Sequence, residues 1–452
     1  MMDVSRRVFI KQGALALASV GLGPACGPYF LRNTVFAAEP DRSSRATGGR
    51  KVLICIFQRG AVDGMSMVVP HGDPYYYQHR NVNGIAIPRT GQDGVLDLDG
   101  TFGLHPALAP LKPIYQAGHL APIHACGSPN ATRSHFDAQD YMEAGAPGDK
   151  SVADGWLTRT LLHCPEDAAK MNSVFRGVAM TSQLPRSLQG EADALAIPDL
   201  RTFGINAANA APVLPRKKNR SMAMGDMQGG HDTSAAGGFE ALYDDAVGDV
   251  LHGAGKETFE ALKMIQSINA KRYMPASGAE YPRTRYGDSL QQIAQLIKAD
   301  VGLEVAFAEA GGWDTHVNQG STQGQLARRL QEFGQGLAAL YTDLGDRMAD
   351  VTILTMSEFG RTARQNGNGG TDHGHATCFL ALGGNINGGK VLGQWPGLAP
   401  EQLYENRDLA VTTDFRDVFG EVAQKHLGVR DLAAVFPHYQ SSPDKFRGVL
   451  KA

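Results

Sequence analysis

Short apolar runs alternate along the chain with longer stretches of helical periodicity. The runs at 51–57, 120–125, 301–308, 351–356 and 378–382 have the length and composition of strands that are buried on both faces. Strands separated by helices predict a mainly parallel central sheet with helices on both faces. The pattern therefore predicts an α/β fold.

Four segments between these runs have the spacing of helices. They are 104–117, a helix that begins at Ser134, 288–299 and 323–348, the last with a continuous apolar stripe along one face. Residues 185–285 show much weaker periodicity. We interpret them as a variable insertion or cap outside the core.

The N-terminus carries an export pattern. Residues 5–11, Ser-Arg-Arg-Val-Phe-Ile-Lys, match the twin-arginine pattern, and a weakly apolar stretch follows at 13–23. We predict a signal peptide over 1–38 that engages the twin-arginine (Tat) translocon, and a periplasmic or otherwise exported protein. The remaining chain, 48–452, is expected to form one domain. It has no run of eighteen apolar residues, so we expect no stable transmembrane anchor.

Composition narrows the possible functions. The chain has 452 residues, of which 42% are hydrophobic and 20% charged, as in ordinary globular domains. Its net charge of -3 lacks the basic excess of a nucleic-acid binder, so we expect no nucleic-acid partner. The five cysteines are widely spaced without a Cys-x-x-Cys pair, which argues against a structural zinc finger. Cys55, inside an apolar run, is expected to be a small buried hydrophobe.

Acidic and histidine side chains collect beside the predicted strands. Asp63 follows the first strand, Asp314 and His316 follow the strand at 301–308, and Glu358 follows the strand at 351–356. Ligands in such sheets gather beyond the carboxyl ends of the strands. We therefore expect these side chains to meet at one rim.

A further group lies just before the strand at 378–382. It consists of Asp372, His373 and His375. Residues two apart in an extended segment point the same way, which applies to His373 with His375 and also to Asp314 with His316. Carboxylate and imidazole sets suit zinc, manganese or iron. The sequence predicts one or two divalent cations, with calcium not distinguished from these three.

The chain resembles the family called domain of unknown function 1501, which is grouped with the alkaline phosphatase/sulfatase superfamily. The resemblance runs through nearly the whole mature chain. It rests on six segments, which are Arg59-Gly60-Ala61-Val62-Asp63-Gly64, Leu104-His105-Pro106-Ala107-Leu108, Arg133-Ser134-His135-Phe136, Gly312-Trp313-Asp314-Thr315-His316, Ser357-Glu358-Phe359-Gly360-Arg361 and Gly370-Thr371-Asp372-His373-Gly374-His375.

The resemblance implies an alkaline phosphatase-like fold and a set of roles. Asp63 would bind metal, and Asp314 with His316 would bind one cation, although their spacing is tighter than the superfamily's usual Asp-x-x-x-His. Glu358 stands where the superfamily usually has Asp-His at a second cation. His373 would complete the first site, with His375 as a rival. Cys126 lacks the spacing to arginine that a formylglycine sulfatase needs.

The segment around Ser134 carries the expected nucleophile. At a helix N-terminus, Ser134 would face substrate anions, and Arg133 would clamp their oxygens. Ser134 is otherwise a simple N-cap, and Thr132 is the alternative nucleophile. His135 could be a metal ligand, a proton donor or a packing residue. Arg361 is either a second anion clamp or a surface arginine.

Two functions follow from these patterns. The first is an exported metal-dependent hydrolase of phosphate or sulfate esters, acting on an anionic small molecule or glycan. The alternative is a non-catalytic relative that binds metal or an anion and serves as a binding or assembly protein of the cell envelope.

Overall fold

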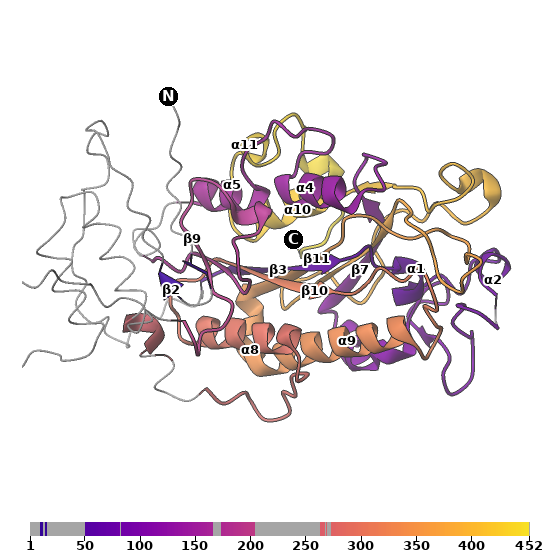
Figure 1. Ribbon diagram of the computed structural model, residues 1–452, viewed down its shortest axis with the longest axis horizontal. Coiled ribbons are helices and arrows are strands. Elements are labelled where there is room, and N and C mark those ends of the chain that lie inside the picture. The colour runs from indigo at the N-terminus through magenta and orange to yellow at the C-terminus, as the bar shows by residue number, and fades with distance from the viewer. Residues whose placement is uncertain are drawn as a thin grey trace, which may run out of the picture.

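The computed structural model in Figure 1 describes residues 50–81, 83–165, 173–203, 263–266, 268 and 273–451, together with 10–11 and 14–15. The two short pairs form an antiparallel ladder of β1 (Ile10–Lys11) and β2 (Ala14–Leu15). Apart from these four positions, the leader predicted over 1–38 lies outside the described residues. Residues 204–262, the centre of the predicted insertion, also lie outside them.

The core of the chain is one eight-stranded sheet with the order β13-β7-β12-β11-β3-β10-β8-β9. Every neighbouring pair is parallel except the two that involve β12, which runs antiparallel to both β11 and β7. The mainly parallel α/β sheet predicted from the sequence is confirmed. The strands are β3 (Val52–Arg59), β7 (Leu120–Gly127), β8 (Gly177–Ala179), β9 (Ala194–Ala196), β10 (Val305–Gly311), β11 (Val351–Met356), β12 (Thr377–Gly383) and β13 (Thr413–Asp414).

Both faces of the sheet are buried because alternate strand residues enter two different cores. In β3, Ile54 and Ile56 pack into one core, whereas Leu53, Cys55 and Phe57 pack into the other. This explains why the strands read as continuous apolar runs rather than as alternating patterns. Cys55 is a buried thiol as predicted, and the other described cysteines are also buried.

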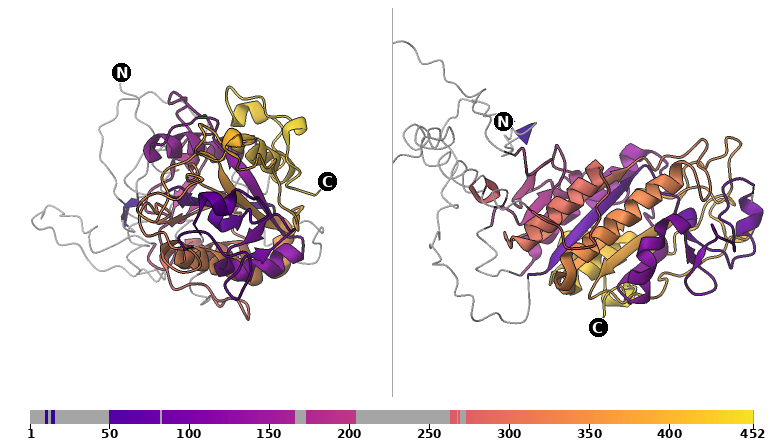
Figure 2. Two further views of the ribbon diagram at one scale, coloured as in Figure 1. Left: turned by 90° about the vertical axis from the view of Figure 1, so that its right-hand side faces the viewer. Right: turned by 90° about the horizontal axis from the view of Figure 1, so that it is seen from below.

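Helices cover each face (Figure 1). Below the sheet in that view lie α8 (Arg285–Lys298) and α9 (Gln325–Leu344), which Figure 2 shows side by side from below. Above it lie α4 (His135–Ala144), α5 (Trp156–His163), α10 (Phe415–Lys425) and α11 (Leu432–Val435). Among the described residues, none of the helices has both the length and the apolarity needed to cross a membrane.

Smaller elements complete the described chain. A three-stranded sheet contains β4 (Val68–Val69), β6 (Gly103–Leu104) and β5 (Leu96–Asp97), in that order. Further short helices are α1 (Gly64–Met67), α2 (Tyr76–His79), α3 (Lys112–Gln116), η1 (Pro106–Leu111), η2 (Arg186–Leu188), η4 (Gly345–Asp350), η5 (Pro400–Gln402) and η6 (Pro443–Lys445), and residues 263–266 and 268 are also helical.

Three segments differ from the sequence predictions. The helix expected over 104–117 is a 3-10 helix followed by the five-residue α3, because prolines remove backbone donors along this stretch. The strand expected over 301–308 instead begins at Val305, since Asp300 and Gly302 have left-handed backbone angles (φ 52° and 89°) that a strand cannot contain. Strand β9 lies in the segment predicted as an insertion, so the sheet extends into that segment.

The reversed direction of β12 decides which loops meet. The carboxyl ends of β3, β7, β10 and β11 lie at one edge of the sheet because these strands run the same way. An antiparallel strand begins at the edge where its parallel neighbours end. The loop before β12 therefore lies beside the loops that follow β10 and β11.

Candidate metal centre

Four side chains from two loops and one helix meet at this edge. Asp314 and His316 follow β10, His373 precedes β12, and His135 is the first residue of α4. Ser134 caps α4 by accepting the backbone N–H of Asp137, which fixes where the helix starts. Local turn and cap geometry thus delivers each side chain to a common point.

Ring nitrogens and a carboxylate face one another at this point. The Nε2 atom of His373 lies 3.0 Å from Nε2 of His135 and 2.9 Å from Nε2 of His316. Asp314 Oδ1 lies 3.0 Å from His316 Nε2 and 3.3 Å from His373 Nε2. One ligand atom each from His135, Asp314 and His373 lies within 4.8 Å of the others, as expected of a group that could hold a metal ion. We call His135, Asp314, His316 and His373 the cation cluster.

The other nitrogen of each ring has its own acceptor. His135 Nδ1 lies 2.7 Å from Glu358 Oε1, and His316 Nδ1 lies 3.0 Å from Asp372 Oδ1. His373 Nδ1 lies 2.9 Å from the carbonyl oxygen of Arg133. Carboxylate and carbonyl oxygens only accept hydrogen bonds, so these partners assign the proton to Nδ1 in all three rings.

The tautomers give the cluster its chemical character. A neutral histidine with its proton on Nδ1 presents a lone pair at Nε2. Three Nε2 lone pairs of neutral rings therefore converge beside a carboxylate. Arg361 donates to that carboxylate, and a bound cation would offset the repulsion that remains. A carboxylate or carbonyl behind each ligating imidazole is the support that metal-binding histidines commonly have in proteins.

Burial and neighbouring charges shift the pKa values of three cluster residues. The hydrogen bond and charge of Glu358 raise the pKa of His135, whereas burial lowers the pKa of His373. Burial favours a raised pKa for Asp314, but the hydrogen bond and charge of Arg361 lower it overall. The side chains of Asp314 and His316 are 45% and 38% exposed, so small molecules can reach the cluster from solvent.

Glu358 and Asp372 stand behind the histidines. Glu358 Oε1 accepts from the backbone N–H of Gly60 at 2.8 Å and from Gln139 Nε2 at 2.9 Å, in addition to His135. Burial favours a raised pKa for Glu358, yet the hydrogen bonds from His135 and Gln139 lower it overall. Both acids were predicted to bind metal directly, whereas the structure places them as hydrogen-bond partners of cluster histidines.

Asp63 and His375, also predicted to bind metal, contact other groups. Asp63 is fully buried and accepts from Arg80, Ser66 and Gln319, with Arg80 Nη1 2.7 Å from Oδ2. His375 is buried, with Nε2 3.0 Å from the carbonyl oxygen of Ser128. Burial lowers the pKa of His375. Neither side chain contacts the cation cluster among the described residues.

The residues expected to bind or attack the substrate differ in their burial and in their protein partners. Ser134 and Thr132 are half-buried, and Thr132 Oγ1 accepts from the backbone N–H of Ser134. The Arg133 guanidinium donates to Glu405 at 2.7 Å and to Asp408 at 2.8 Å. Arg361 is fully buried and donates to Asp314 and to several backbone carbonyls, so it is not a surface arginine.

The sequence interpretation missed several supports. Gln139 lies four residues after His135 on α4, and this helical spacing would have revealed it. Arg407 donates to the carbonyl oxygen of His373, and no local pattern marks it. Arg59 donates to Gln139, Glu143 and Glu309. It therefore links helix α4, which carries His135, to strand β10.

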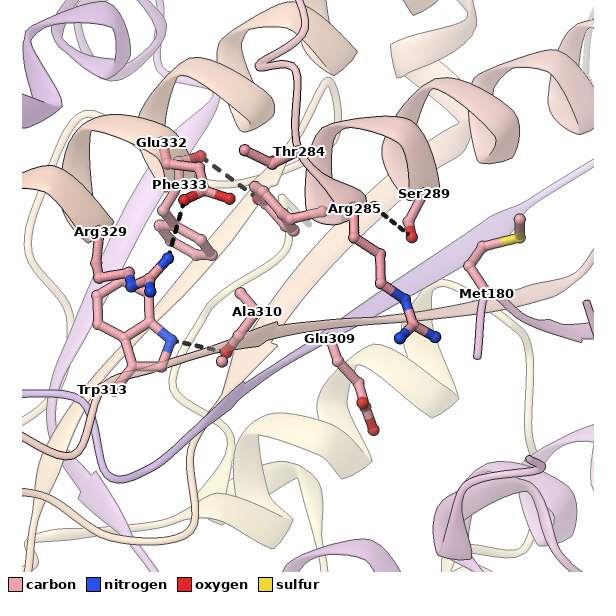
Figure 3. Close-up of a pocket in the computed structure, with 12 residues that line it drawn as sticks. Met180, Thr284, Arg285, Ser289, Glu309, Ala310, Trp313, Arg329, Glu332 and Phe333 are labelled. Atoms are coloured by element: carbon pink, nitrogen blue, oxygen red, sulfur yellow. Dashed lines mark hydrogen bonds and ion pairs between the residues drawn. The ribbon is translucent and has the colours of Figure 1, made fainter. Parts of the chain in front are cut away.

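A cavity of about 390 Å³ lies beside the carboxyl end of β10 (Figure 3). The start of α8, part of α9 and residues 309–313 bound it. No member of the cation cluster lines it, but Trp313, which does, directly precedes Asp314.

Comparison with known proteins places the chain in one family. The family described as "Protein of unknown function (DUF1501)" matches residues 50–436. No curated protein matches the chain. The match covers most of the chain and includes every residue of the cation cluster, so this protein belongs to the DUF1501 family.

Proposed function

We propose that this protein is a metal-dependent hydrolase of phosphate or sulfate esters that holds one divalent cation in the cation cluster. The observation that carries the proposal is the convergence of three Nε2 lone pairs on the carboxylate of Asp314. Folding alone does not require this arrangement, because it brings electron-rich atoms together. A bound cation would make it favourable.

The donor set favours particular metals and a single ion. Three imidazoles and one carboxylate suit zinc, iron or manganese better than calcium, which prefers oxygen ligands. Glu358 is nearly fully buried and occupied by His135, Gln139 and the Gly60 N–H, and Asp63 is occupied by Arg80. With both acids occupied, we propose one cation rather than two.

The proposed reaction combines the cation with groups on α4. A divalent cation supplies positive charge that polarises an ester oxygen and makes water more acidic. Ser134 is our preferred nucleophile because it directly precedes His135 at the N-terminus of a ten-residue helix, where backbone N–H groups favour an anion. Thr132 and water remain the alternatives that the experiment below separates.

The relation to the alkaline phosphatase/sulfatase superfamily is part of the proposal. A mainly parallel sheet with acids and histidines at its carboxyl edge supports it. Since one fold can serve many reactions, the argument for hydrolysis comes from the site and not from the sheet. The proposed substrate is an anionic small molecule or a glycan that carries an ester group.

Elemental analysis and an ester screen test the function. The full chain is purified after folding in the cytoplasm, its metal content is measured, and aryl phosphate, phosphodiester and aryl sulfate substrates are offered. We expect about one metal per chain and turnover that His373→Ala abolishes together with metal. Turnover that survives Ser134→Ala but not Thr132→Ala makes Thr132 the nucleophile, and survival of both variants indicates water. A chain without metal contradicts the proposal.

One observation favours the non-catalytic alternative. Both arginines expected to bind substrate oxygens, Arg133 and Arg361, already bind protein groups. A binding protein needs the cation cluster but no free arginine beside it. Stoichiometric metal without turnover on any of the three ester classes would support a metal- or anion-binding role in the cell envelope.

We also propose export through the Tat translocon, which rests on the Arg6-Arg7 pair and the apolar stretch that follows it. Replacing both arginines with lysine should keep the protein in the cytoplasm. Cell fractionation of the wild-type and doubly substituted chains measures this, and equal distributions would contradict export by this route.

A further inference from the structure

The cavity beside β10 has the dimensions and lining of a binding site for a small molecule. Its volume of about 390 Å³ falls in the range of ligand pockets. Buried aromatic side chains form part of its wall, namely Trp313, Phe333 and Tyr286. The indole N–H of Trp313 donates to the carbonyl oxygen of Ala310 at 2.7 Å, which fixes the ring in the wall (Figure 3).

The charged side chains that line the cavity differ in whether they have an ion-pair partner. Glu309 is paired with Arg59 at 2.7 Å, and Arg329 is paired with Glu332 at 3.3 Å. Arg285 is exposed and has neither an ion pair nor a side-chain hydrogen bond among the described residues. In Figure 3 its guanidinium extends from α8 across the cavity toward the side of Glu309.

Two further features favour an anion at Arg285. Arg285 is the first residue of the fourteen-residue helix α8, whose N-terminus carries partial positive charge. A guanidinium can bind a carboxylate, sulfate or phosphate group through two parallel hydrogen bonds. We infer that the cavity binds an organic anion about the size of a monosaccharide, and that Arg285 recognises its charged group.

The cavity and the cation cluster share one segment of chain. Gly311 and Trp313 line the cavity, and Asp314, the next residue, belongs to the cluster. Trp313 and Asp314 are consecutive residues, so a ligand in the cavity would contact the chain segment that carries Asp314. If the proposed function holds, the anion in the cavity is the non-reacting part of the ester substrate. This last step rests on that function, whereas anion binding itself does not.

Direct binding tests the inference on the metal-loaded full chain. The probes are glucuronate, 6-deoxyglucose-6-sulfonate, which has no ester bond, and neutral glucose, each titrated by calorimetry. We expect at least one anion to bind about tenfold more tightly than glucose. The two anions separate a carboxylate from a sulfonate preference. Equal affinities for all three probes, or no binding of any, would overturn the inference.

A matched pair of variants isolates Arg285. Arg285→Gln should reduce anion affinity about tenfold, to that of glucose, whereas Arg283→Gln removes another exposed arginine two residues away, outside the cavity lining, and should leave it unchanged. Arg285→Lys should retain part of the affinity, and thermal melting checks that each variant is folded. Equal losses in both glutamine variants would show unspecific attraction and overturn the inference.

Removing the metal separates this inference from the proposed function. After chelation the anion should still bind in the cavity, since the cluster does not line it. Anion binding by a metal-loaded chain that turns over none of the three ester classes would leave the cavity assigned and the hydrolase rejected. Turnover with unchanged anion affinity in Arg285→Gln would leave the hydrolase standing and reject the cavity assignment.

Discussion

Asp63 and Asp314 each come soon after a strand of the same sheet, yet their surroundings are opposite. Asp63 is fully buried, and every charge and hydrogen bond around it is matched by Arg80, Ser66 and Gln319. Asp314 is 45% exposed and shares its surroundings with three electron-rich nitrogens. One acid completes the fold through a buried ion pair, and the other, although Arg361 donates to it, still faces histidine nitrogens and solvent where a cation can bind.

The difference shows how to recognise a functional site among similar residues. Buried polar groups that are fully satisfied mainly support structure. A set of acceptors that face one another with fewer donors than lone pairs favours a bound cation. Each prediction below tests whether this contrast between the two aspartates holds.

The largest effect on stability is expected at Asp63. Asp63→Asn should lower the free energy of unfolding by about 3–5 kcal/mol at pH 7, because it leaves the buried Arg80 without its counter-charge. Metal affinity should remain within about twofold. Chemical denaturation and metal titration measure the two quantities. Asp314→Asn is the control, and it should lose metal with a smaller loss of stability, because Arg361 keeps its backbone carbonyl acceptors.

The same pair predicts a pH dependence. Burial favours a raised pKa for Asp63, but the charge and hydrogen bonds of Arg80 outweigh it and lower the pKa. A carboxyl whose pKa is lower in the folded state stabilises the fold above its unfolded pKa of about 3.9. This contribution disappears as the pH falls through the lower folded pKa. The stability difference between wild type and Asp63→Asn should therefore shrink below pH 4, and a constant difference down to pH 2 would contradict the assignment.

The next largest effect is expected in the cluster. His373 is the ring that contacts both other histidines, so His373→Ala should weaken metal binding more than about a hundredfold, beyond the usual loss from a supporting residue. Competition with a chelator dye measures the affinity. His375→Ala is the matched control from the same loop, and it should bind metal as the wild type does. Equal losses of metal affinity in the two variants would contradict the assignment of His373 to the cation cluster.

Smaller losses are expected for the residues behind the histidines. Glu358→Gln should reduce metal affinity about 10- to 100-fold, because a neutral amide holds the His135 tautomer less firmly. Asp372→Asn should reduce metal affinity about tenfold or less, because Asp372 is half-exposed and water screens its interaction with His316. Competition with the same chelator dye should show a larger loss of metal affinity for Glu358→Gln than for Asp372→Asn. A larger loss of metal affinity in Asp372→Asn than in Glu358→Gln would contradict the argument that the more buried supporting acid contributes more.

Much of the fold followed from local patterns. The apolar runs located β3, β7, β11 and β12, and the helical stripe located α9. The direction of β12 could not be predicted, because an apolar run has the same composition in either direction. That direction alone explains why a loop before a strand meets loops that follow strands.

The site was predictable only in part. Motifs beside strand ends identified Asp314, His316 and His373, and the sequence left the role of His135 open. Nothing in the sequence distinguishes Asp63 from Asp314, because the difference depends on Arg80, which reaches Asp63 through tertiary packing. The same holds for Glu358, whose exposure and partners depend on Gln139 and Gly60.

The antiparallel direction of β12 has a consequence for the exchange of chain segments between related proteins. The connection from β11 to β12, residues 357–376, leaves and re-enters the sheet at one edge. It supplies Glu358, Arg361, Asp372 and His373 from a single uninterrupted stretch. A transplant of these twenty positions by recombination would move one cluster histidine and three of its supporting residues at once without crossing any strand. In this architecture, the surroundings of His135, Asp314 and His316 can be exchanged as one segment while the sheet stays in place.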